Sequence, residues 1–318
     1  MQKLHLGAAQ CALDLGDGSE RAEYVNQDYI LHKLGRPHRA IGIMYTYYPH
    51  DKQWPQRISK ACKDMNITFQ WDYPYDDYFP FNADGQPWEQ MRDIRRHGQD
   101  AALTLTLDCS LSDDELREVA RMLRPYGRMT IRINHECGGT WFTHNKRFTY
   151  EQVGKFFAHF SDIIHQEAPN VRTVFCAGFA QADGKLEKED EFAVAYRAAD
   201  VWSADCYLAL HYGWPYDVAE IGGGQYKADS VGMYYDMFRR TYERASSQFG
   251  AKPLVTAEFN TDGDVTGPRH QGESVIRFAE AFRDHKADWF KAISLYQFRD
   301  RGRLGLEIED PNNPAVGA

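Results

Sequence analysis

The sequence has 318 residues, of which 43% are hydrophobic and 14% aromatic, enough to fill one large core. Its 37 basic residues are outnumbered by 46 acidic ones, for a net charge of −9. This balance argues against nucleic acid or an anionic membrane as a partner, because both are bound through basic patches. No apolar run approaches the length of a membrane span, so we expect no membrane partner.

The six cysteines stand apart at positions 11, 62, 109, 137, 176 and 206, without a Cys-x-x-Cys pair. This spacing favours free thiols in a reducing compartment over a disulfide framework. The N-terminus does not begin with a charged-then-apolar signal segment, which leaves two locations open, the cytoplasm or secretion after removal of a signal. The sequence has neither a His-Glu-x-x-His motif nor a glycine-rich phosphate loop, so we expect no metal and no cofactor.

Strand-like and helix-like runs alternate along the whole chain without a linker, which is typical of βα repeats around a parallel sheet. We therefore predict an α/β fold, a (β/α)8 barrel in a single domain spanning residues 1–318. Two capping boxes predict helix starts, Ser112 with Glu115 and Thr149 with Gln152. The sequence offers nine strand candidates for eight places, at 3–8, 41–48, 67–72, 102–108, 130–134, 171–178, 201–207, 253–260 and 293–298.

The surplus strand lies in the first half of the chain, where four candidates compete for three places. We assign 3–8 to an accessory position, so that residues 1–40 contribute an accessory strand and helix; the alternative removes 102–108. Two candidates lie between 130–134 and 253–260. If 130–134 is strand four, then 253–260 is strand seven and 293–298 is strand eight.

Two of the predicted strands end in a glutamate before a polar turn, the first at Glu136 and the second at Glu258. Active sites of (β/α)8 barrels lie at the C-terminal ends of the strands, so both carboxylates are expected to face one pocket. Cleavage of a glycosidic bond needs such a pair, one group to protonate the leaving oxygen and one to face the anomeric carbon. The two motifs therefore predict a glycosidase.

The motif Arg132-Ile-Asn-His-Glu136, followed by Gly139 and Trp141, resembles the acid/base strand of clan A glycoside hydrolases, family 26 in particular. Thr256-Ala-Glu258-Phe is similar to the nucleophile strand of that clan. The resemblance implies a retaining hydrolase with Glu136 as acid/base and Glu258 as nucleophile.

Ser203-Ala-Asp205-Cys-Tyr207 resembles the strand between these two, whose tyrosine bonds the nucleophile in the family. Tyr207 is therefore the expected donor to Glu258. The family usually has Met-Asn-Gly after the acid/base glutamate, whereas this chain has Cys137-Gly138-Gly139. A sugar contact from that asparagine is missing here, which leaves the substrate class open.

The resemblance implies a carbohydrate substrate, with β-mannan as the first choice and β-glucan or β-xylan behind it. Two alternatives stay open. One is an exo-acting clan A glycosidase, similar to family 39, that acts on an exopolysaccharide. The other is a carbohydrate-binding barrel that keeps the cleft without the chemistry.

Further strand-end side chains are candidates for substrate binding. Arg132 shares a strand face with Asn134 and Glu136 by alternation, and it either supplies positive charge near the nucleophile or forms a structural ion pair. His135 orients Glu136, bonds a sugar hydroxyl or is structural, and Asp205 bonds either a substrate hydroxyl or Arg132. Asp72 ends another predicted strand. The aromatic candidates, which either stack on sugar rings or pack in the core, are Trp71, Trp141, Trp214, Tyr216 and Tyr296.

Overall fold

The computed structural model describes residues 12–16, 24–35, 38–50, 79–81, 86–139, 144, 147–181, 183–208, 231–261, 268–296, 298 and 306. The strands are β1 Ala12–Gly16, β2 Ala40–Tyr47, β3 Phe79–Pro80, β4 Asp100–Leu107, β5 Met129–Ile133, β6 Val171–Phe179, β7 Val201–Tyr207, β8 Leu254–Asn260 and β9 Phe290–Leu295. The helices are α1 Gln27–Leu34, α3 Gln86–Arg96, α4 Asp113–Met122, α6 Tyr150–Glu167, α7 Glu189–Ala198, α8 Val231–Phe249 and α10 Pro268–Asp284.

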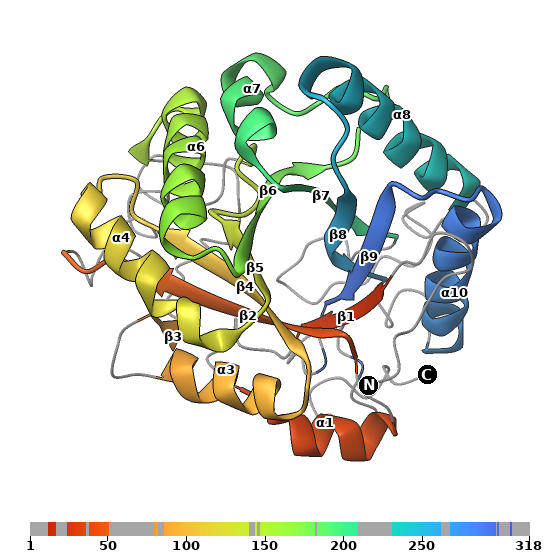
Figure 1. Cartoon of the computed structure of the whole chain (residues 1–318). Coiled ribbons are helices and arrows are strands. Elements are labelled where there is room, and N and C mark those ends of the chain that lie inside the picture. The colour runs from red at the N-terminus through yellow and green to blue at the C-terminus, as the bar shows by residue number, and fades with distance from the viewer. Residues whose placement is uncertain are drawn as a thin grey trace, which may run out of the picture.

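The strands form a closed parallel ring. In chain order β1, β2, β4, β5, β6, β7, β8 and β9 each pair with the next, and β9 pairs back with β1. The helices lie outside this ring (Figure 1). The short β3 extends the edge of β2 at Tyr45 and Thr46, beyond the residues of β2 that pair with β1. The predicted α/β class and (β/α)8 barrel are confirmed.

Around this ring β5 is the fourth strand, β8 the seventh and β9 the eighth, as predicted. The first place belongs to β1, which is not among the nine candidates. The alternative that removes 102–108 is wrong, because β4 pairs with both β2 and β5. The candidates 3–8 and 67–72 lie outside the described residues, so an accessory position for 3–8 stays a prediction.

Both capping boxes start the helices that they predict. The Ser112 side chain accepts the amide of Glu115 at the start of α4, and the Glu115 side chain accepts the amide of Ser112. Thr149 and Gln152 make the same pair of bonds at the start of α6. Among the described helices, none combines the length and apolarity that a membrane crossing requires.

A large share of the aromatic residues packs between the barrel and its helices. Phe238 of α8, Phe278 and Phe282 of α10 and Phe290 of β9 are all fully buried. The ring centroids of Phe282 and Phe290 are 4.0 Å apart. These rings hold α8 and α10 against the last two strands, since buried aromatic pairs add to the energy of area burial. In this layer the aromatic content serves the core.

Candidate active site

The strand that leads to Glu136 ends earlier than alternation predicts. β5 stops at Ile133, and Asn134 and Glu136 then adopt left-handed backbone angles, with φ of 48° and 50°. Residues with a Cβ rarely adopt this conformation, and functional sites are where it is most often found. The expectation that Asn134 continues the face of Arg132 is therefore wrong, whereas Glu136 reaches the same site through the turn.

The turn after Glu136 is fastened to β6. The amide of Cys137 donates to the carbonyl of Cys176 at 3.0 Å, and the amide of Gly138 donates to the carbonyl of Ala177 at 2.6 Å. The amide of Gly139 donates back to the carbonyl of Glu136 at 2.9 Å. These bonds fix the backbone that carries the Glu136 carboxylate.

Glycine at position 138 has a physical reason that involves a distant residue. A Cβ added there would lie 2.5 Å from the Glu187 side chain, and one added at Gly178 would lie 2.5 Å from a Glu187 carboxylate oxygen. Glu187, in the loop between β6 and α7, thus occupies the space beside the Glu136 turn. Burial raises the pKa of Glu187. The position at which family 26 usually has asparagine is therefore one where this chain has no room for a Cβ.

Three carboxylates converge in the barrel. Glu136, Asp205 of β7 and Glu258 of β8 each place a carboxylate oxygen within 4.8 Å of the others. Their residues are 6%, 1% and 7% exposed. Three buried acids at this spacing repel one another, so the site needs a positive charge among them.

Arg132 supplies that charge from β5. Its Nη2 donates to Oε1 of Glu258 at 2.6 Å, its Nη1 donates to Oδ2 of Asp205 at 3.2 Å, and its Nε donates to Oγ1 of Thr104 at 3.0 Å. Burial disfavours the charged guanidinium, but Glu258 and Asp205 outweigh it and hold the pKa of Arg132 above its ordinary value. Both expected roles of Arg132 therefore coincide, since its ion pair is with the expected nucleophile itself.

Glu258 is held at both carboxylate oxygens. Arg132 bonds Oε1, and the hydroxyl of Tyr207 donates to Oε2 at 2.9 Å. The expected contact from Tyr207 is present in the structure. The Tyr207 ring meets Tyr296 edge to face, with centroids 5.8 Å apart. Tyr296, which follows β9, thus lies beside the tyrosine that bonds Glu258.

Asp205 bonds several groups of the site while its own side chain has no contact with solvent. Its side chain is fully buried and accepts the amide of Glu258 at 3.0 Å and the thiol of Cys176 at 3.3 Å in addition to Arg132. Burial and the neighbouring Glu258 raise the pKa of Asp205 to about 7, against the opposing effect of Arg132. Of its two expected roles, the bond to Arg132 is the one present, and a bond to a substrate hydroxyl does not fit this burial.

His135 is buried beside Arg132. Burial, Arg132 and His144 together hold the pKa of His135 well below its ordinary value, so its ring is neutral. A neutral imidazole can orient a neighbour or donate one hydrogen bond, but it adds no charge. The candidates Trp71, Asp72, Trp141, Trp214 and Tyr216 lie outside the described residues.

The sequence reasoning missed Thr104, Asn134 and Cys176 as parts of this site. Thr104 pairs directly with Arg132 in the β4–β5 register, so alternation along 102–108 could have indicated it. Cys176 sits inside an apolar strand and carries no such signal. Asn134 shows its role only through its backbone angles and side-chain bonds.

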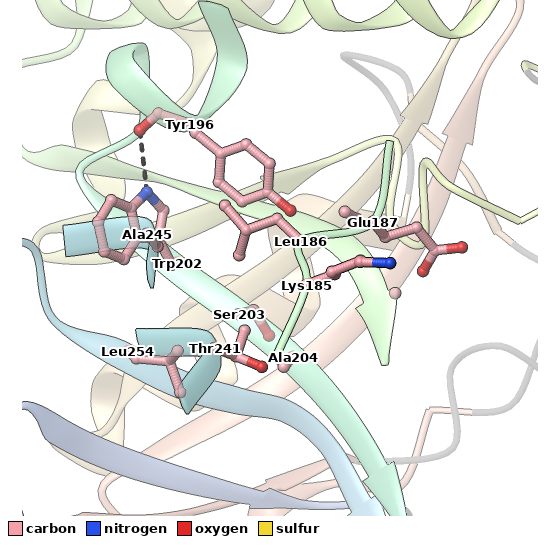
Figure 2. Close-up of a pocket in the computed structure, with 12 residues that line it drawn as sticks. Lys185, Leu186, Glu187, Tyr196, Trp202, Ser203, Ala204, Thr241, Ala245 and Leu254 are labelled. Carbon is pink, nitrogen blue, oxygen red and sulfur yellow. Dashed lines mark hydrogen bonds between the residues drawn. The ribbon is translucent and has the colours of Figure 1, made fainter. Parts of the chain in front are cut away.

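A small cavity lies between β6 and β7 and the helices α7 and α8, and Glu187 is among the residues that line it (Figure 2). Tyr196, Leu186, Ala245 and Leu254 supply much of its wall. The indole of Trp202, also on this wall, donates to the carbonyl of Tyr196 at 2.9 Å. The lining is mainly apolar, and the cavity belongs to the layer between strands and helices.

Comparisons with known proteins agree on the fold. No family model matches the sequence, and a comparison with curated proteins finds no match. A GH26 β-mannanase from Bacteroides ovatus aligns over 99% of this chain and 86% of its own, at 10% identity and a TM-score of 0.54. The GH53 catalytic domain of Ignisphaera aggregans aligns over 92% and 85%, at 12% identity and a TM-score of 0.51.

A family 39 glycoside hydrolase from Bacteroides cellulosilyticus aligns over 96% of this chain and 61% of its own, at 10% identity and a TM-score of 0.55. At such identities the similarity establishes a shared fold. The resemblance to clan A glycoside hydrolases that the two glutamate motifs indicate is thus confirmed in the architecture, and this chain has the barrel that those enzymes share.

Proposed function

We propose that this protein is a retaining glycoside hydrolase that cleaves β-linked polysaccharides or oligosaccharides by double displacement. The observation that carries the proposal is the approach of Glu136 and Glu258, whose nearest carboxylate oxygens lie within 4.8 Å. Retaining glycosidases hold their two carboxyl groups about 5–5.5 Å apart, and inverting ones about 6.5–9.5 Å apart to admit a water. The spacing supports the retaining mechanism, and it favours an enzyme over a barrel that only binds carbohydrate.

Glu258 acts as the nucleophile in this proposal. Arg132 and Tyr207 each bond one of its oxygens, at 2.6 and 2.9 Å. The guanidinium places a positive charge against the carboxylate that attacks the anomeric carbon. Two fixed bonds also hold the attacking oxygen in position, which lowers the entropy lost on reaching the transition state.

Glu136 acts as the acid/base. In the first step its proton passes to the glycosidic oxygen as the bond to the anomeric carbon breaks and the bond to Glu258 forms. In the second step its carboxylate takes a proton from the incoming water, whose oxygen displaces Glu258 from that carbon. The sugar leaves with its original β configuration, and both carboxyl groups return to their starting states.

The substrate is a β-linked glycan, with β-mannan first and β-glucan or β-xylan behind it. The fold similarity to a GH26 β-mannanase supports this order. Tyr296, beside Tyr207, is a described aromatic that can contact the sugar at this site. Trp71, Asp72, Trp141, Trp214, Tyr216 and His135 are the further proposed sugar contacts.

A panel of β-mannan, β-glucan and β-xylan, assayed by release of reducing ends, tests the substrate. Mixed oligomers indicate cleavage within chains, whereas disaccharides alone indicate an exo-acting enzyme. The Glu258→Ala variant tests the chemistry. It is expected to be inactive, and azide is expected to restore cleavage of an activated β-glycoside and give the α-glycosyl azide. Full activity of Glu258→Ala without azide would refute the proposed mechanism.

A further inference from the structure

Asn134 occupies the bend that separates β5 from Glu136. It is fully buried, and its φ of 48° lies in the left-handed region, as does the φ of 50° at Glu136 two residues later. A Cβ makes this conformation unfavourable, although asparagine tolerates it better than most residues because its short amide can bond nearby backbone. Two such residues flanking His135 define a tight turn that needs support from its surroundings.

The Asn134 side chain provides that support toward β4. The amide of Leu107 donates to Oδ1 of Asn134 at 2.7 Å, and Nδ2 of Asn134 donates to the thiol sulfur of Cys109 at 3.3 Å. The backbone amide of Asn134 donates to the carbonyl of Leu105 at 3.1 Å. The regular pairing of β4 with β5 ends at Leu105 and Ile133. The side-chain amide therefore continues the ladder after the β5 backbone has turned away.

On its opposite side the turn is attached to β6 by the backbone amides of Cys137 and Gly138, which donate to the carbonyls of Cys176 and Ala177. The turn that carries Glu136 is thus bonded to β4 on one side and to β6 on the other. The two bonds to β6 are available to any residue type with a backbone amide, whereas two of the three bonds toward β4 depend on the Asn134 side chain. An acceptor for Leu107 and a donor for Cys109 are both required, and an amide offers the two together.

We propose that Asn134 is a positioning residue for the acid/base Glu136, and that its side-chain amide fixes the turn that aims the Glu136 carboxyl group at the glycosidic oxygen. Asn134 itself is fully buried, so it acts on the substrate through Glu136 alone. The inference rests on the proposed function. It concerns the step in which the Glu136 proton moves to the leaving oxygen while Glu258 bonds the anomeric carbon.

The dependence of the rate on the leaving group tests this role directly. A 2,4-dinitrophenyl β-glycoside leaves without protonation, whereas a phenyl β-glycoside needs the acid. In Asn134→Gly, which keeps access to positive φ but lacks the amide, kcat/KM for the phenyl glycoside is expected to fall on the order of 10- to 100-fold more than for the dinitrophenyl glycoside. The sugar is the one that the wild-type enzyme cleaves in the polysaccharide panel.

Asn170→Ala is the matched control. The Asn170 amide bonds the carbonyls of Leu123 and Gly127, at 3.2 and 2.7 Å, just before β6 begins and therefore at the other end of the barrel strands. This variant loses a comparable pair of bonds, and both substrates are expected to change by the same factor. Cys109→Ala removes only the acceptor of the Asn134 amide, and it is expected to show a smaller loss that is again selective for the phenyl glycoside. This variant tests the same role if Asn134→Gly does not fold.

Equal losses on the two glycosides in Asn134→Gly and in Cys109→Ala, or no loss in either, would overturn the role of Asn134. Glu258→Ala separates this result from a failure of the proposed function. If wild type is active and Glu258→Ala is not, the outcome for Asn134 stands by itself. If Glu258→Ala retains full activity, or wild type cleaves no β-glycoside, both proposals fall together.

Discussion

Replacing Arg132 by methionine is the sharpest test of how the barrel tolerates its buried acids. The Arg132 side chain is 5% exposed, and its partners Asp205 and Glu258 are 0% and 9% exposed. Removing one member of a buried ion pair leaves an uncompensated charge and typically costs about 3–5 kcal/mol. Here one cation serves two carboxylates, so we expect the free energy of unfolding at pH 7 to fall by about 5 kcal/mol, the upper end of that range.

The loss of unfolding free energy in Arg132→Met is expected to depend on pH. Without Arg132 the carboxylate of Asp205 loses the charge that opposes the effect of burial, so its folded-state pKa, already above the unfolded one, is expected to rise further. The folded state then binds more protons, and stability falls as pH rises. The deficit of Arg132→Met relative to wild type is therefore expected to be largest near pH 8 and to shrink toward pH 5.

Urea unfolding followed by tryptophan fluorescence measures the effect, with an unchanged m-value as the sign that the denatured state is the same. Arg121→Met is the control, because Arg121 pairs with Glu167 while its own side chain is 56% exposed. This control is expected to change stability little at any pH, since exposed pairs contribute little. A variant Arg132→Met as stable as wild type at pH 8, or with a deficit that does not depend on pH, would refute the reasoning.

Three further predictions follow from the same contacts. Tyr207→Phe loses the bond that holds one oxygen of Glu258 and is expected to lower kcat by about 10- to 100-fold, since a small misplacement of a reacting group costs up to about 100-fold in rate; an unchanged kcat would contradict it. Gly138→Asn is expected to lower the melting temperature by contact with Glu187, and adding Glu187→Ala should recover part of it; no recovery would show that the contact is not the cause. The pKa of Asp205 is raised to about 7, above its unfolded value of about 4, so the contribution of Asp205 to stability is greatest below pH 4 and is lost as pH rises through 7. Asp205→Asn is therefore expected to flatten the dependence of the unfolding free energy on pH over that range. An equally steep dependence would be evidence against this reasoning.

The strand ends were the most predictable part of the site. β5 and β8 each bring an acid to the C-terminal end of a buried strand, and counting two candidates between them placed them fourth and seventh in the ring. The count predicts these places because the order of strands around a (β/α)8 barrel follows their order in the chain. The motif Ser203-Ala-Asp205-Cys-Tyr207 likewise predicts Tyr207 as a donor to Glu258, and the Tyr207 hydroxyl bonds that carboxylate in the structure.

Other features depend on contacts that a local pattern does not encode. β1 is five residues long, with Asp14 at its centre, so it shows no clear apolar alternation. Asn134 looks like the next residue of β5, and only its bonds to Leu107 and Cys109 reveal the turn. Gly138 reads as a simple turn residue, although a Cβ there would meet the backbone carbonyl of Ala177 and the side chain of Glu187, which lies 49 positions further along the chain.

The anomeric configuration of the first product tests the central claim most directly. Proton NMR during the first minutes of cleavage of a β-linked substrate distinguishes the two anomers before mutarotation mixes them. Two carboxylates as close as Glu136 and Glu258, within 4.8 Å, predict that the β-anomer appears first. Initial release of the α-anomer would require a water between the carboxylates and would contradict the account.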